Sequence, residues 1–300
     1  MSDPVVLTDR RLTAAPAIAD QAAERRRRQG RYRLTVQLLR VLAAAVWIGS
    51  WELTTRISLP GADHTLVDKF FFGQPSGIGQ QLYTWVTQGT ALGPLWQQVA
   101  VTMQETILGF LVGSVLGVVA GVLLGRNRLL ADVFSPYIKA ANSIPRVVLG
   151  ALFAISLGLD LKSKVTTAAV LVFFVVFFNA FQGVREVDGN LINNVRILGA
   201  SRLQVVRNVV IPSALTWIIA SLHVAFGFAV IGAIVGEFLG AQHGLGVIIA
   251  DSMNNFDADG IFGGMIIIGA IALIAEWLIS LLEHRLLAWR PDPVTEVAGL

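Results

Sequence analysis

Few side chains in this sequence could do chemistry, and the candidates lie in long apolar runs. Asn142 and Arg146 interrupt one run, His223 lies within another, and Glu237 lies at the end of that second run. Polar groups at membrane depth are tolerated where they are buried in protein or line a cavity, so these four residues are candidates for a solute pathway. Both Arg146 and His223 also have structural alternatives. Arg146 could extend to the polar interface of the membrane, and His223 could form a hydrogen bond with a neighbouring helix.

The same inventory does not indicate catalysis. The chain has no cysteine, and its four histidines are scattered, so neither a disulfide nor a metal centre is expected. A membrane enzyme would need His, Asp or Glu side chains clustered at one depth. There is also no G-x-x-x-x-G-K-[ST] phosphate loop, so this chain is expected to bind no nucleotide or other cofactor itself.

A second candidate site is the polar stretch over residues 193–212, which separates two apolar runs. Apolar residues recur at helical spacing on both sides of Gly199, which predicts two short amphipathic helices with a bend between them. Gly199 suits the end of the first helix, Ser201 can cap the second, and Pro212 suits the first turn of the next long helix. The apolar positions are Leu191, Val195, Leu198, Leu203, Val206 and Val210, and the polar sides keep Arg196, Arg202 and Arg207.

Composition limits the class of protein. Of the 300 residues, 54% are hydrophobic and only 14% are charged, and the mean hydropathy is +0.66. The surface of a soluble domain could not be covered with so few polar groups. The chain is therefore expected to be an integral membrane protein.

Six runs are long and apolar enough to approach the ~30 Å of a bilayer core. The sequence thus predicts an all-α polytopic membrane protein with about six transmembrane helices. Glycines at every fourth position from Gly109 to Gly125 predict close packing of the second helix against a neighbour. The expected spans are residues 38–59, 103–124, 133–157, 165–181, 215–238 and 261–282.

Arginine is concentrated in alternate connecting segments. Nine arginines lie between Arg10 and Arg40, and others follow the second, fourth and sixth spans. Because such residues favour the cytosolic side, both termini and the polar stretch are predicted to be cytosolic. The domains expected are a disordered basic tail over residues 1–35, a transmembrane domain over 36–290 with a loop at 186–212, and a cytosolic tail over 291–300. The arginine block in the first tail lacks aromatic interleaving, so nucleic-acid binding is not predicted.

Several local predictions concern the side of the membrane opposite the cytosol. Glu52 and Arg56 are spaced to pair on one helix face. Glu105 is expected to lie within reach of water, and Lys164 to close a short outer turn. The polar segment over residues 239–260 is expected to be either a solvated loop or a contact for an extracytoplasmic partner.

The polar stretch resembles a known signature. Gly199, nine residues, Val209, one residue and then Ile211-Pro212 are similar to the loop of binding-protein-dependent ABC importer permeases, whose consensus is EAA, three residues, G, nine residues, I, one residue, LP. Residues 142–159, 178–186 and 236–246 resemble the nitrate/sulfonate/taurine branch of that family. Asn193-Asn194-Val195 departs from the Glu-Ala-Ala of the consensus.

The resemblance implies a type I ABC importer permease fold in a bacterial inner membrane, without enzymatic activity of its own. It implies three partners: a cytosolic ATPase dimer that holds ATP and magnesium, a second permease subunit in a homodimer, and an extracytoplasmic substrate-binding protein. The solute would be a nitrate-, sulfonate- or taurine-type anion or a related small polar compound. The alternative is a secondary transporter or channel not driven by ATP. The implied docking residues are Asn193, Asn194, Arg196, Gly199, Ala200, Ser201, Arg202, Ile211 and Pro212.

Overall fold

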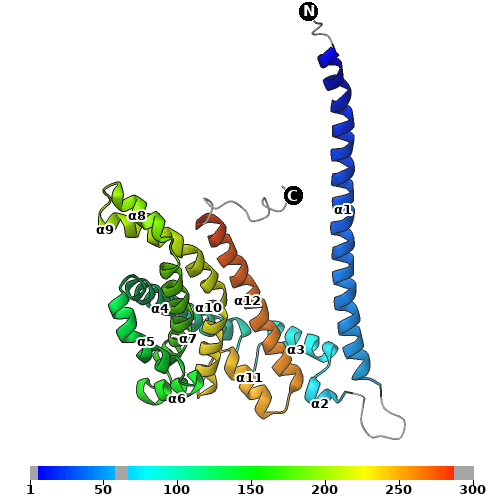
Figure 1. Ribbon diagram of the computed structural model, residues 1–300. Helices are drawn as coiled ribbons and strands as arrows, with labels where there is room; N and C mark the ends of the chain where they lie inside the picture. The colour runs from blue at the N-terminus through cyan, green and yellow to red at the C-terminus, as the bar shows by residue number, and fades with distance from the viewer. Residues whose placement is uncertain (1–5, 58–66, 287–300) are drawn as a thin grey trace, which may run out of the picture. The chain divides into compact units, whose positions relative to one another are not determined.

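The computed structural model describes residues 6–57 and 67–286, excluding the side chains of residues 6–27, 29, 146 and 286. The predicted tail over residues 291–300 lies outside the described residues. The described chain is helical, as the sequence predicted (Figure 1). Its elements are α1 (Val6–Thr54), α2 (Lys69–Phe72), α3 (Pro75–Thr87), α4 (Leu95–Arg126), α5 (Arg128–Asn142), α6 (Arg146–Leu157), α7 (Leu161–Arg185), α8 (Gly189–Ile197), α9 (Arg202–Val205), the π-helix η1 (Val206–Val210), α10 (Ile211–Phe238), α11 (Leu245–Asn254) and α12 (Ala258–Leu286).

The chain divides into two compact units, Met1–Ser76 and Gly77–Leu300. In the first unit, α1 begins at Val6, whereas the sequence predicted a disordered tail over residues 1–35. Alanine and arginine are frequent in this segment, and both favour helix. At the other end of α1, Glu52 pairs with Arg56 at 2.6 Å, which confirms the predicted ion pair. Glu52 Oε1 also accepts hydrogen bonds from Gln74 Nε2 and Ser76 Oγ.

In the second unit, α7 packs between α4 and α10. The glycines of α4 face α7, so the packing stripe predicted from the sequence is confirmed. A Cβ added at Gly117 would lie 2.9 Å from Phe173 O, and one added at Gly121 would lie 2.7 Å from Ala180 Cβ. Val172 and Val176 of α7, which also meet the α4 glycines, form a buried cluster with Ala225 and Ala229 of α10. Backbone-to-backbone approach therefore replaces side-chain interdigitation along α4, as is common for helix pairs in membranes.

The described part of the chain contains five candidate spans, or six if one bent pair of helices counts as a span. Five helices are long and apolar enough to cross a bilayer, at Gly30–Thr54, Leu95–Arg126, Leu161–Arg185, Arg202–Phe238 and Ala258–Arg285. The predicted third span is instead a pair of helices, Arg128–Asn142 and Val147–Leu157, bent by 89°. The break lies at Ser143–Pro145, because Pro145 has no N–H to donate and restricts the residue before it. Pro136, also expected to interrupt this span, lies inside α5.

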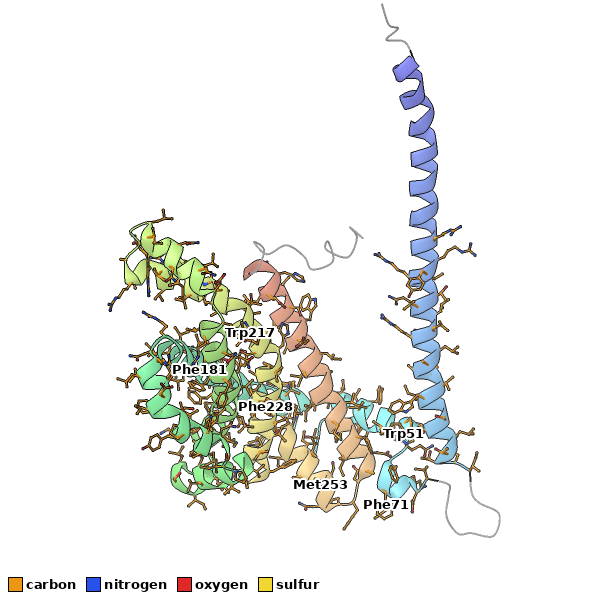
Figure 2. All side chains as sticks on the ribbon, in the orientation of Figure 1. Trp51, Phe71, Phe181, Trp217, Phe228 and Met253 are labelled. Atoms are coloured by element: carbon orange, nitrogen blue, oxygen red, sulfur yellow. The ribbon has the colours of Figure 1, made fainter. Side chains whose placement is uncertain are left out.

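The segment over residues 239–260 is not a solvated loop. It contains α11, whose Leu245, Ile248 and Ile249 are buried. Leu245 and Ile248 form a cluster with Trp85 of α3. Figure 1 shows α11 and α6 at one end of this unit and α8 and α9 at the opposite end, and Figure 2 labels Met253 on α11.

The α4–α7 contact predicts a stability effect. At Gly113, an added Cβ would meet Ala169 O and lie 2.7 Å from Val172 Cβ. Gly113→Ala should therefore destabilise the bundle by about 1–3 kcal/mol, as overpacking does. The measurement is thermal unfolding of the detergent-solubilised protein.

The matched control is Gly269→Ala in α12, where an added Cβ meets nothing within 4 Å. That variant should unfold at or above the wild-type temperature, because alanine favours helix over glycine. Equal effects of the two substitutions would contradict the close α4–α7 approach.

Candidate functional site

The polar stretch forms a bent loop whose turn is built by local hydrogen bonds. The first short helix, α8, starts at Asp188, whose carboxylate accepts from Asn190 N at 2.8 Å. It ends before Gly199, which has φ +87° and donates its N–H to Arg196 O at 2.9 Å. This left-handed conformation favours glycine, so the predicted stop at Gly199 is confirmed.

The second short helix begins with a capping box. Ser201 Oγ accepts from Gln204 N at 3.3 Å, and Gln204 Oε1 accepts from Ser201 N at 2.8 Å. The predicted cap at Ser201 is therefore confirmed. The second short helix is not separate from the next span, because α9 continues through η1 into α10. Ile211 is the first residue of α10, and Pro212 lies in the first turn of α10. Because the helix is continuous here, the missing N–H of Pro212 removes one intrahelical hydrogen bond, and the π-helical turn η1 lies directly before this position.

The tip of the loop exposes large apolar side chains. Ile197 is 83% exposed, Leu198 84% and Leu203 75%. Leu198 and Leu203, which have the helical spacing of the apolar positions, are therefore not core residues. The helices α8 and α9 that carry them project from the end of α7 and α10 (Figure 1). Arg196 and Arg202 flank this apolar tip, and both side chains are exposed.

The stem of the loop is anchored in the bundle. Val205 and Val210 are buried with Val184 of α7 and Ala214 of α10. Val195 and Ala200 pack against the same cluster, and Ala200 N donates to Val195 O at 3.2 Å. An exposed apolar tip on a buried stem is typical of a protein interaction site.

The loop shares a cavity of about 980 Å³ with the turn between α4 and α5. The sequence did not predict this cavity, because the residues that line it come from two segments, 123–130 and 184–210, which are more than 50 positions apart. The arginines suggest that it would attract anionic groups. Its basic lining residues are Arg126, Arg128, Arg185, Arg196 and Arg202.

Asn193 and Asn194, which stand where the consensus has Glu and Ala, are exposed on α8. Asn194 contributes its backbone oxygen to the end of that helix by accepting from Leu198 N at 3.1 Å. The local fold of the loop is therefore complete without the consensus glutamate.

The four pathway candidates are not gathered at one place. Asn142 is the last residue of α5, and Arg146 is the first of α6, with its side chain outside the described residues. His223 and Glu237 are 14 residues apart on α10, which corresponds to about 21 Å along a helix. His223 Nδ1 lies 2.7 Å from Glu276 Oε1, so the expected bond to a neighbouring helix is confirmed.

Glu237 is buried in a hydrogen-bond network that holds α11. Its Oε1 accepts from Thr102 Oγ1 at 2.6 Å, and its Oε2 accepts from Gly246 N at 2.5 Å. Thr102 Oγ1 in turn accepts from Leu245 N at 2.8 Å. These side chains supply the acceptors that the first turn of α11 lacks within the helix.

A buried ion pair adjoins this network. Lys164 Nζ lies 2.9 Å from Glu105 Oε1, and the two side chains are 8% and 1% exposed. The predictions that Glu105 reaches water and that Lys164 closes an outer turn are therefore wrong. Lys164 lies within α7, and Gly236 of α10 allows its stem to pack closely, since a Cβ there would lie 2.9 Å from Lys164 Cγ.

A family described as "Binding-protein-dependent transport system inner membrane component" matches residues 113–288. That range contains the bent loop with its Gly199 turn and capping box. The chain belongs to this family. It is a multi-pass inner membrane permease of the ABC importer class.

Relatives of this permease include several named transport subunits. It is 30% identical over 198 residues to the putative aliphatic sulfonates transport permease protein SsuC of Bacillus subtilis, covering 66% of this chain and 72% of that protein. It is 26% identical over 228 residues to the taurine transport system permease protein TauC of Escherichia coli, covering 76% and 83%. The formylaminopyrimidine transport permease protein ThiX of Halalkalibacterium halodurans is 31% identical over 189 residues, covering 63% and 76%.

The fold of the permease matches a solved structure. A chain of the MetNI methionine ABC transporter in an inward-facing conformation superposes with a TM-score of 0.53 at 20% sequence identity, covering 64% of this chain and 94% of that chain. This likeness supports the type I importer fold that the sequence resemblance implied.

The buried pair predicts a large effect on stability. Lys164→Met leaves the Glu105 carboxylate without its cation in a buried site, which should cost about 3–5 kcal/mol. Thermal unfolding in detergent measures the loss. The matched control is Lys162→Met two residues earlier, where the side chain is exposed and the same substitution should have little effect. Similar unfolding temperatures for the two variants would contradict the ion pair.

Proposed function

We propose that this permease forms half of a solute pathway in an ATP-driven importer and that its bent loop docks a separate cytosolic ATPase. The observation that carries the proposal is the exposed apolar tip of Ile197, Leu198 and Leu203 on a buried stem. Exposed apolar groups on a rigid projection are costly in water and are typical of protein interfaces. The docking residues predicted from the sequence, Asn193 to Arg202 with Ile211 and Pro212, all belong to this loop or its stem.

Charge supports the choice of partner. The arginine-lined cavity beside the loop favours an acidic surface on the ATPase. Under the positive-inside rule, the same arginines support a cytosolic position for this end of the molecule. Both termini would then be cytosolic. ATP and magnesium would bind the ATPase subunits, and closure of the ATPase dimer would move α8 and, through η1, the span α10.

One chain provides only part of a pathway. Little of the apolar window of the span Ala258–Arg285 is buried, only 11%. Such a helix needs lipid or a second subunit as its neighbour, so we propose a dimer of permeases with the pathway between them. An extracytoplasmic binding protein would deliver the solute to the end that carries α11.

The solute proposed is a small polar compound of the kinds for which relatives are named. Those names cover aliphatic sulfonates and taurine as well as formylaminopyrimidine. They span anions, a zwitterion and an uncharged nitrogen heterocycle, so the relatives alone leave the charge class open.

The docking proposal predicts that the Gly199 turn is required for coupling. Gly199→Val forces a β-branched residue into the left-handed region, which costs about 1–2 kcal/mol and redirects the tip. ATP-driven uptake in proteoliposomes and co-purification with the partner ATPase should both be lost, while membrane insertion stays normal.

The matched control is Gly189→Val at the first position of α8, where φ is not positive and an added Cβ meets nothing within 4 Å. This variant should keep uptake and ATPase association. If Gly199→Val still bound the ATPase as tightly as the wild type, the docking role would be refuted.

A second test removes the apolar contact without changing the backbone. Leu198→Asp should abolish ATPase association, because it places a charge at the centre of the apolar tip, yet it should leave thermal stability unchanged, since this side chain is 84% exposed. Leu198→Met should retain association. Association measured by co-purification that is insensitive to Leu198→Asp would show that the ATPase binds elsewhere.

A further inference from the structure

Three titratable side chains meet between α10 and α12. His223 Nδ1 lies 2.7 Å from Glu276 Oε1, and His223 Nε2 lies 3.0 Å from Glu283 Oε2. The imidazole therefore bridges two carboxylates that are seven residues apart on α12. In this group, two acidic side chains face one basic side chain.

Glu276 lies too deep in its span to be an ordinary surface carboxylate. It precedes Arg285 at the end of the span by nine residues, which is about 13 Å along a helix. Its side chain is nevertheless 52% exposed, against 19% for His223. A carboxylate facing lipid at this depth costs several kcal/mol, so this face must meet either water or another protein surface.

The polar face continues along α12 as a narrow stripe. Glu276, Ser280 and Glu283 follow one another at i, i+4 and i+7, which places them on the same side of the helix. Leu278 lies on the opposite side and is 52% exposed. Among the described residues, His223 is the one partner found for either glutamate, so each carboxylate keeps an oxygen for water or a solute.

We propose that this stripe, defined by Glu276, Ser280 and Glu283 with His223 beside it, lines the translocation pathway and selects by charge. The proposal rests on the proposed function, in which two permeases enclose that pathway. The negative stripe attracts solutes that carry positive charge or present N–H donors and repels anions. The solute is then an organic cation or a protonated nitrogen base, and a sulfonate-type anion is disfavoured.

The test uses the absence of cysteine from this chain. Ser280→Cys introduces a single thiol in the stripe of the full transporter in proteoliposomes. Two small membrane-impermeant methanethiosulfonate reagents are compared, one with a cationic 2-(trimethylammonium)ethyl group and one with an anionic 2-sulfonatoethyl group. The rate at which each reagent modifies the protein thiol is divided by its rate of reaction with free 2-mercaptoethanol. The cationic reagent should be preferred by about tenfold, the lower end of the effect expected for a cleft lined by charge of one sign.

Adding Glu276→Gln to the cysteine variant should bring this preference close to one. The position control is Leu278→Cys, which should react with neither reagent, because it faces away from the stripe. Ala272→Cys, one turn before Glu276 on the same side, provides a second reporter should Ser280→Cys fold poorly.

Two results would overturn the proposal. Lack of reaction at both Ser280→Cys and Ala272→Cys would show that the stripe faces lipid or is sealed by a subunit contact. A preference unchanged by Glu276→Gln would show that these carboxylates do not set the local potential. The thiol reaction needs no bound ATPase, so its failure is distinguishable from a failure of docking at Gly199.

Discussion

The absence of water from the bilayer core is the constraint on which the rest of this structure depends. Every buried polar group must find a partner within the protein, and helices must approach closely enough to gain packing energy without a hydrophobic driving force. The glycine face of α4 against α7 meets the second demand. The Glu105–Lys164 pair and the Glu237 network meet the first, and they do so where α4, α7, α10 and α11 converge.

The two ends of the second unit differ in how their polar and apolar groups are buried. At one end, Glu237 and Thr102 hold the start of α11 with buried hydrogen bonds, which favours a fixed arrangement. At the other end, the bent loop is anchored through Val205 and Val210 but leaves Leu198 exposed. The loop is joined directly to α10, because α9 continues through η1 into that helix without a break. The exposed tip is therefore connected to the packed bundle.

Local features of the loop were predictable because they depend on near neighbours in the chain. Gly199 in the left-handed region and the Ser201 capping box involve only residues within three or four positions. Which side of each short helix is buried was not predictable, since Leu198 and Leu203 have the spacing of core residues but project beyond the bundle. The helix that begins at Val6 was not predicted from the sequence, although the alanines and arginines of this segment favour helix.

The sequence alone determined the class of protein, its helical spans, the glycine face of α4 and the family to which the loop belongs, because hydropathy, spacing and turn residues are properties of short segments. Tertiary structure decided which polar residues are paired. Glu105 and Lys164 are 59 positions apart, and His223 meets Glu276 across 53, so no local pattern could join them. Such pairs arise only when the folded helices bring distant charges together.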